Sequence, residues 1–247
     1  MEELPEPVSN QFVLNTLLLY QGPQVTIKIG SHHREYVIFK DLLCSESAYF
    51  SAMFNGPFIE GQQQAANLKE GDGLSVHTFE AFIQWLYAGK IQFNVNDCSE
   101  KILSAIELAR VGVMWDVPKL RAPIALYIKE VILSGPYKIY NHDYDCNIQF
   151  IDCKHIAAAC FLPSKHPVRE ILAEASVESF ILARSFKLLE AAERNPEFAA
   201  DLIQKIYGPC VSILDWIREH CECENNKTIF EDPFTGSVWP PRNEDDL

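Results

Sequence analysis

Hydrophobic and polar positions alternate in two short stretches near the start of the chain. Residues 25–29 read Val-Thr-Ile-Lys-Ile, and residues 35–39 follow a looser version of the same pattern. A period of two is typical of a β-strand with one buried face. Residues 30–33, Gly-Ser-His-His, predict the turn between them. The pattern therefore predicts a β-hairpin, and a further short strand is predicted at residues 65–68.

Helical spacing dominates the residues after the hairpin. Residues 40–44 and 47–54 predict two short helices, the second with Ser47 as its N-cap and an end near Asn55-Gly56. Residues 75–88 predict a longer helix closed by a glycine, with apolar residues at spacings of three and four on one buried face. These apolar residues are Phe79, Phe82, Ile83 and Leu86.

One strand and two helices complete the first half. The strand is predicted at residues 90–93, and the helices at about 100–112 and 118–133. Ser-Gly-Pro at residues 134–136 predicts a domain boundary. The second half shows only helical patterns and no strands, and beyond residue 223 the chain becomes polar, proline-bearing and acidic. The four further helices are predicted at residues 153–161, 167–174, 177–192 and 196–221.

The length of the chain, 247 residues of which 48% are hydrophobic, suits two domains that each bury a core. The predicted fold class is α+β, followed by an all-helical region. We divide the chain into an N-terminal segment 1–20, a mixed domain 21–133, a helical domain 134–222 and a flexible acidic tail 223–247.

Residues 9–20 predict a short helix with very little polar face, which needs a partner surface. Two alternatives stay open. The helix packs on its own subunit, or Phe12, Val13 and Leu17 lie across a two-fold axis and form a dimer contact, because a two-fold contact uses the same patch twice.

The charge of the chain is strongly acidic. It has 34 acidic and 21 basic residues and a formal net charge of -13, so its field repels nucleic-acid phosphates and anionic lipid. The first residues are acidic where a signal peptide needs positive charge, and no apolar run approaches the roughly 20 residues of a membrane span. We therefore expect no nucleic-acid or membrane partner, and a place in the cytoplasm or nucleus.

Cysteine and histidine occur together in two places, but neither predicts a metal site. A structural zinc site usually takes pairs of ligands from two separate segments, and the second pair is missing here. The eight cysteines show no repeating spacing and indicate reduced, packed thiols. The two groups are Cys210, His220, Cys221 and Cys223, and Cys146, Cys153, His155 and Cys160.

The sequence contains no recognisable catalytic motif. We find no Gly-x-Ser-x-Gly elbow, no glycine loop followed by lysine and no His-Glu-x-x-His helix. A cysteine–histidine hydrolase stays open as an alternative, because its residues meet in space and not in sequence. We expect a protein that is not an enzyme, with no catalytic residue, cofactor, metal or small-molecule substrate.

The order of these elements resembles a BTB/POZ domain over about residues 21–133, most of all the type found in many fungal proteins of unassigned function. Where the family usually has a histidine before the lysine that opens its first helix, this chain has Phe39. The resemblance rests on the hairpin 25–39, the helical pair 40–50, the Phe58-Ile59-Glu60 turn, the motif Phe79-x-x-Phe82-x-x-Trp85-Leu86-Tyr87-x-Gly89, and the helix 103–110.

The resemblance implies a module that pairs with itself, with another BTB-type protein or with other partners. In some members, a hydrophobic-x-Glu element placed as Phe58-x-Glu60 docks a cullin scaffold, which makes the protein a substrate adaptor of a ubiquitin ligase. The helical second half is similar to the extension of such adaptors, although no kelch, ankyrin or zinc-finger region follows. The candidate protein-binding residues are Phe58, Glu60, Tyr49 and Met53.

Three functions stay open: self-association with partner recruitment, a cullin-linked adaptor, and a nuclear transcription-linked scaffold that does not touch DNA. An exposed aromatic beside a carboxylate has the composition of an interface hot spot. In the alternative interpretation, Phe58 packs on the core and Glu60 is solvated in a surface loop.

Overall fold

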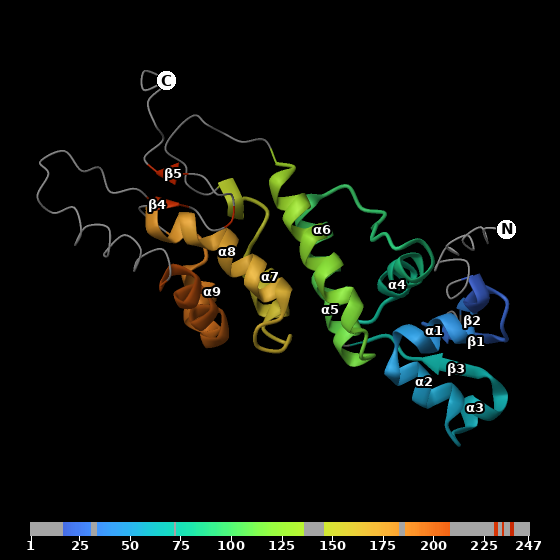
Figure 1. The fold of residues 1–247 in the computed structure, drawn as a ribbon. Coiled ribbons are helices and arrows are strands. Elements are labelled where there is room, and N and C mark those ends of the chain that lie inside the picture. Colours follow the sequence, from blue (N-terminus) through green and yellow to red (C-terminus); the bar gives the residue numbers. More distant parts are fainter. Residues whose placement is uncertain are drawn as a thin grey trace, which may run out of the picture. The chain divides into compact units, whose positions relative to one another are not determined.

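The computed structural model describes residues 17–30, 34–71, 73–135, 146–182, 186–207, 230–231, 234 and 238–239. They fall into two compact units, which we describe one at a time (Figure 1). Unit 1 comprises Met1–Gln92 and Val111–Leu120, and unit 2 comprises Phe93–Arg110 and Arg121–Leu247.

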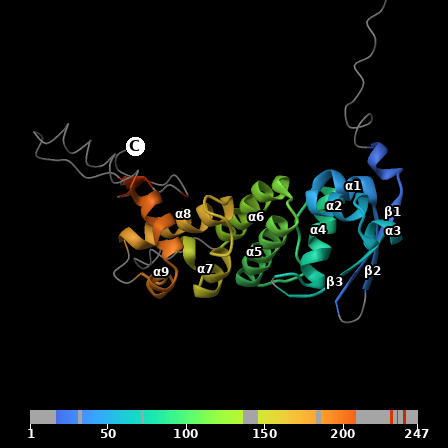
Figure 2. The same ribbon diagram turned by 90° about the horizontal axis from the view of Figure 1, so that it is seen from below.

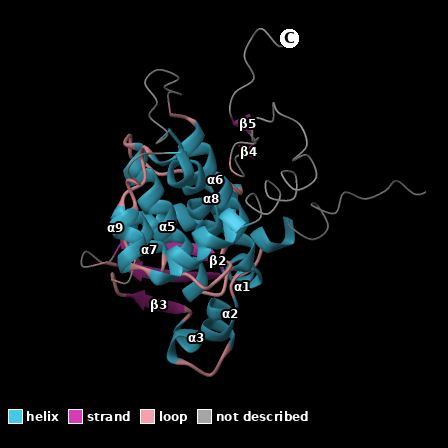
Figure 3. Cartoon of the chain, turned by 90° about the vertical axis from the view of Figure 1, so that its left-hand side faces the viewer, coloured by secondary structure: helices cyan, strands magenta, loops and turns pink. Residues whose placement is uncertain are grey.

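Unit 1 contains a three-stranded sheet, coloured magenta in Figure 3. Strand β1 (Gln24–Ile29) pairs antiparallel with β2 (Arg34–Phe39), so the predicted hairpin is confirmed. Strand β3 (Ala65–Leu68), also predicted, pairs parallel with the other edge of β1. The side chains of β1 alternate between buried and partly exposed, as its period of two requires.

Helices cover this sheet, and their ends follow the predicted capping residues. Ser47 accepts a hydrogen bond from the Phe50 N–H at the start of α2, and Ser75 caps α4 in the same way. Gly89 closes α4 in the left-handed conformation, at φ 65°. Figure 2 shows α1, α2 and α4 together in this unit. The helical elements are η2 (Leu17–Tyr20), α1 (Lys40–Glu46), α2 (Ala48–Asn55), α3 (Ile59–Gln63), α4 (Val76–Ala88) and η3 (Pro118–Leu120).

An aromatic cluster around Trp115 forms the core of unit 1. The Trp115 ring centroid lies 5.0 Å from that of Phe50, 5.8 Å from that of Phe79 and 5.1 Å from that of Phe82. The Ser47 hydroxyl donates to the Trp115 carbonyl oxygen at 2.6 Å. The same side chain therefore caps α2 and ties it to the residue that follows α5 (Cys98–Met114).

Phe39, at the position where the resemblance to BTB/POZ domains leads us to expect histidine, finds its partner in an aromatic group. Its backbone N–H donates to the Tyr87 hydroxyl at 3.0 Å, at the point where β2 passes into α1. The Tyr20 ring packs edge-on against both Phe39 and Tyr87. The start of α1 is thus held by a tyrosine from α4 rather than by a side chain at position 39.

Unit 2 is largely helical, with α8 in contact with α6, α7 and η4. Arg169 of α8 is buried and joins three segments, because its donors reach the Asp201 carboxylate and the backbone carbonyls of Leu162 and Glu197. Besides the first part of α5, the helical elements are α6 (Arg121–Leu133), η4 (Cys146–Ile148), α7 (Cys153–Ala159), α8 (Pro167–Leu182), α9 (Leu189–Arg194) and residues 196–207.

The predicted strand at residues 90–93 is wrong. These residues form no strand, and the sheet of unit 1 consists of β2, β1 and β3. Phe93 is nevertheless buried, with its ring 5.6 Å from that of Tyr127. Residues 90–93 therefore form a loop that is anchored by the Phe93 side chain, and their backbone does not pair with a strand.

Two predictions for the second half also differ from the structure. The helix predicted at residues 167–174 continues through Ala175-Ser176 into the single helix α8, which ends at Leu182, and Ser176 donates to the Leu172 carbonyl. The helix predicted at residues 177–192 is therefore divided between the end of α8 and the start of α9 (Leu189–Arg194). The expectation of no strands is wrong as well, because β4 (Phe230–Glu231) and β5 (Val238–Trp239) form an antiparallel pair. Residues 208–221 of the last predicted helix lie outside the described residues.

Candidate protein-interaction site

The corner between α2 and α3 carries the most exposed apolar side chains of the predicted site. Phe58 is 56% exposed, Ile59 61% and Tyr49 39%. Phe58 directly precedes α3, Ile59 and Glu60 open it, and Tyr49 and Met53 lie one turn apart on α2. The structure thus places Phe58 on the surface, and not on the core as the alternative interpretation required.

Two glycines allow this corner to be tight. A Cβ atom on Gly61 would lie 2.7 Å from the Gly56 carbonyl oxygen, so only glycine lets α3 pack this closely on the end of α2. A Cβ atom on Gly56 would lie 2.4 Å from the Ala52 carbonyl oxygen and 3.1 Å from the Phe58 ring. The bare backbone of Gly56 therefore gives the Phe58 ring a surface on which to rest while its other face stays open.

Polar contacts fix the frame beneath these side chains. The Lys40 ammonium donates to the Phe54 carbonyl oxygen at 3.0 Å, and the Gln64 amide donates to the same oxygen at 3.3 Å and also to the Gly61 carbonyl. These donors satisfy carbonyl groups that the ends of α2 and α3 leave free. Gln64 adopts the left-handed conformation, at φ 51°, and ends α3. The exposed residues therefore stand on a well-bonded scaffold.

Tyr49 and Glu60 are electrostatically coupled across the corner. Burial of the Tyr49 phenol raises its pKa, and the Glu60 carboxylate raises it further. The neutral phenol can donate a hydrogen bond. The Tyr49 ring packs edge-on against Phe50 at 5.2 Å, which anchors it to the core.

The structure brings all four predicted binding residues together from two consecutive helices. Met53 and Glu60 are partly buried, and Phe58 and Tyr49 are exposed. Ile59 was not among the predicted binding residues, although it is the most exposed apolar side chain of this surface. Its place within the Phe58-Ile59-Glu60 turn was the signal that could have indicated it. We call Tyr49, Met53, Phe58, Ile59 and Glu60 the α2–α3 surface.

The predicted dimerisation residues are not placed. Phe12 and Val13 lie outside the described residues, and Leu17 opens η2 but its side chain is not described. Their role stays a prediction.

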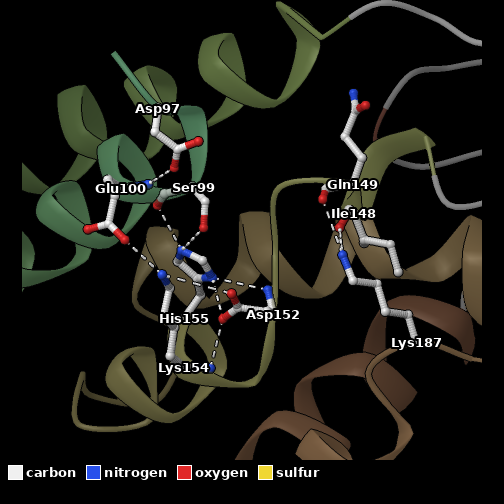
Figure 4. A network of polar contacts seen from close by, with 9 residues as sticks. All are labelled: Asp97, Ser99, Glu100, Ile148, Gln149, Asp152, Lys154, His155 and Lys187. Atoms are coloured by element: carbon white, nitrogen blue, oxygen red, sulfur yellow. Dashed lines mark hydrogen bonds and ion pairs between the residues drawn. The ribbon is translucent and has the colours of Figure 1, made fainter. Parts of the chain in front are cut away.

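A serine, a histidine and an aspartate meet in unit 2, but their geometry is structural (Figure 4). His155 is fully buried, with Nε2 at 2.8 Å from the Ser99 carbonyl oxygen and 3.4 Å from the Ser99 hydroxyl. Its Nδ1 accepts from the Asp152 backbone N–H at 3.0 Å, as part of a capping box at the start of α7. A serine nucleophile needs a ring nitrogen free to accept its proton, and here the Nε2 proton faces a carbonyl oxygen. This group joins α7 to α5.

The part of the chain that the structure describes holds no group of three or more metal-binding side chains. Cys44, Cys98, Cys153 and Cys160 are free thiols. The group formed by residues 210, 220, 221 and 223 lies outside the described residues. None of the described helices combines the length and the apolar character that crossing a membrane would require.

The comparison with protein families agrees with the fold of unit 1. Residues 15–120 match the BTB/POZ domain. The matched segment contains the three-stranded sheet, α1 to α4 and the whole α2–α3 surface. A search of curated proteins found no match to the chain. The likeness to fungal members stays a prediction.

The BTB/POZ domain is a protein–protein interaction module whose members self-associate and bind partners such as cullins, and it is not typically enzymatic. The α+β architecture predicted from the sequence is confirmed, with a small sheet, packed helices and a helical remainder.

Proposed function

We propose that this chain recruits a second protein through the α2–α3 surface of its BTB/POZ domain. The observation that carries the proposal is the exposure of Phe58 and Ile59, at 56% and 61%, beside the coupled Tyr49 and Glu60. A partner that covers these side chains would bury an aromatic and an aliphatic anchor and would meet a carboxylate that fixes its orientation.

The partner we propose is the N-terminal domain of a cullin, with the chain acting as its substrate adaptor. The spacing Phe58-x-Glu60 supports this choice, as does the position of both residues at the start of a helix within the BTB/POZ domain. Unit 2 would then carry the surface that captures a substrate. We propose that the chain carries out this function in the cytoplasm or the nucleus.

We also propose that the chain self-associates through its first 20 residues. The support is the apolar pattern of Phe12, Val13 and Leu17, which needs a partner surface. Deletion of residues 1–20 should lower the mass measured by light scattering after size exclusion. A truncated chain of unchanged oligomeric mass would contradict this part of the proposal.

Recruitment is tested with the purified cullin N-terminal domain and the full chain, by light scattering and by calorimetry. The double variant Phe58→Ala/Ile59→Ala should keep its fold and lose the complex, because both side chains are largely exposed in the free protein. Val37→Ala is the matched control, since Val37 is 60% exposed but lies on β2. Loss of binding in both variants, or in neither, would remove the α2–α3 surface from the proposal.

Glu60→Ala tests whether the carboxylate orients the partner, separately from the apolar anchors Phe58 and Ile59. We expect it to weaken the cullin complex less than the double variant does, while leaving stability close to that of the wild type, because a rim carboxylate contributes little to folding. Unchanged affinity in Glu60→Ala would show that the carboxylate has no part in docking.

A further inference from the structure

Phe234 is buried in a part of the chain whose composition predicts a loose tail. Its side chain is 3% exposed, although the surrounding sequence is polar and rich in proline. The Lys129 ammonium of α6 lies 4.9 Å from the centre of the Phe234 ring, within the range of a cation–π contact. Phe234 therefore packs beside α6 within unit 2.

The strands on either side of Phe234 are too short to hold it in place by themselves. Strand β4 pairs with β5 through Phe230 opposite Trp239 and Glu231 opposite Val238, two residues in each strand. An isolated two-stranded hairpin is marginal in water even when it is longer. The buried Phe234, which lies between the two strands in the sequence, therefore supplies a further anchor for this element.

The contacts of the Phe234 side chain are of the kind by which proteins bind peptides. An aromatic side chain is enclosed, and a lysine stands over its face. Glu231 and Asp232 precede Phe234 by three and two positions, so the sequence around the anchor is acidic and opposite in charge to Lys129. On α6 itself, Ile128 and Ile132 are buried, whereas Lys129 reaches the Phe234 ring.

We propose that the face of α6 around Lys129 is a binding site for an acidic segment that carries a phenylalanine, and that Phe234 occupies this site in cis. A tethered segment competes at an effective concentration on the order of millimolar, so a free ligand must exceed that level or displace the tail by better contacts. A partner with the same chemistry would bind unit 2 only as the tail is released. This site lies outside the α2–α3 surface, and its test does not depend on a cullin.

The test uses the full chain and a fluorescein-labelled peptide of residues 226–240, measured by fluorescence anisotropy. Phe234→Ala should empty the site and bind the peptide at least about tenfold more tightly than the wild type does, because the tethered competitor is gone. The double variant Phe234→Ala/Lys129→Glu should lose this gain. Phe234→Ala/Lys101→Glu should keep it, since it carries the same charge change on α5.

Two results would overturn the proposal. One is a Phe234→Ala chain that binds the peptide no better than the wild type, and the other is equal binding of a peptide in which Phe234 is itself replaced by alanine. Should Phe234→Ala fail to fold, amide hydrogen exchange on the wild-type chain decides. Excess unlabelled peptide should then speed exchange at Phe230, Glu231, Val238 and Trp239, and unchanged protection would show a fixed structural contact only.

Discussion

His155 of α7 places its Nε2 atom 2.8 Å from the carbonyl oxygen of Ser99 in α5, and the imidazole is fully buried. A carbonyl oxygen only accepts hydrogen bonds, so Nε2 carries the proton and donates it. Nδ1 of the same ring accepts the Asp152 backbone N–H. One side chain thus closes the capping box of α7 and joins α7 to α5 (Figure 4).

Replacement of His155 should destabilise the protein strongly. His155→Ala leaves the Ser99 carbonyl and the Asp152 N–H without their buried partner, and it also opens a cavity, so we expect a loss of about 3 kcal/mol in the free energy of unfolding. Urea denaturation followed by circular dichroism measures this change.

The neighbouring Lys154 supplies the matched control. Lys154 pairs with Glu100 at 2.9 Å between the same two helices, but both side chains are exposed. Because water screens such a pair, Lys154→Ala should leave the unfolding midpoint nearly unchanged. Equal effects of the two substitutions would show that the join between α5 and α7 is not carried by the buried imidazole.

Much of the fold of unit 1 could be predicted because its signals are local. The alternation at residues 25–29, the caps Ser47 and Ser75 and the closing Gly89 each act within a few residues of the structure they determine. The prediction of a strand at residues 90–93 was wrong because a strand also needs a free sheet edge with which to pair, and residues distant in the sequence form that edge. The sequence of residues 90–93 is equally consistent with a loop anchored by Phe93.

The α2–α3 surface could be located from the sequence but not oriented. Phe58-Ile59-Glu60 indicated its position, whereas the outward direction of Phe58 depends on the close approach of Gly61 to the Gly56 carbonyl. That contact joins two helices through the Gly56-Pro57-Phe58 linker, and neither helix predicts it alone. The burial of Phe234 was beyond prediction for a similar reason, since Lys129 lies far away in the sequence.

The coupling between Tyr49 and Glu60 can be measured directly. Burial raises the pKa of Tyr49 first, and the Glu60 carboxylate adds to the effect because it disfavours a second negative charge nearby. Glu60→Gln removes only the second cause, so the pKa of Tyr49 should fall without reaching that of a free tyrosine. NMR of protein labelled with carbon-13 at the tyrosine ring follows this titration.

A second tyrosine–glutamate pair serves as the control for that measurement. Burial raises the pKa of Tyr36, and its hydrogen bond to Glu80, 2.8 Å long, raises it further. Glu80→Gln should therefore lower the pKa of Tyr36 and leave that of Tyr49 unchanged. Glu60→Gln should lower the pKa of Tyr49 and leave that of Tyr36 unchanged. A Tyr49 resonance that titrates identically in wild type and Glu60→Gln would refute the coupling.

His166 should make the stability of the protein depend on pH. Burial, together with the charges of Arg121 and Arg169, lowers its pKa to about 4. The unfolded chain therefore binds a proton at a higher pH than the folded chain does, so the stabilising contribution is complete above about pH 6.5 and is lost as the pH falls towards 4. The loss amounts to roughly 2–3 kcal/mol in the free energy of unfolding over this interval.

Urea denaturation of His166→Gln from pH 4.5 to 7 should show a free energy of unfolding that depends less steeply on pH than in the wild type. His77→Gln, at an exposed position, should keep the wild-type slope. A wild-type slope in His166→Gln would mean that other groups cause the acid sensitivity.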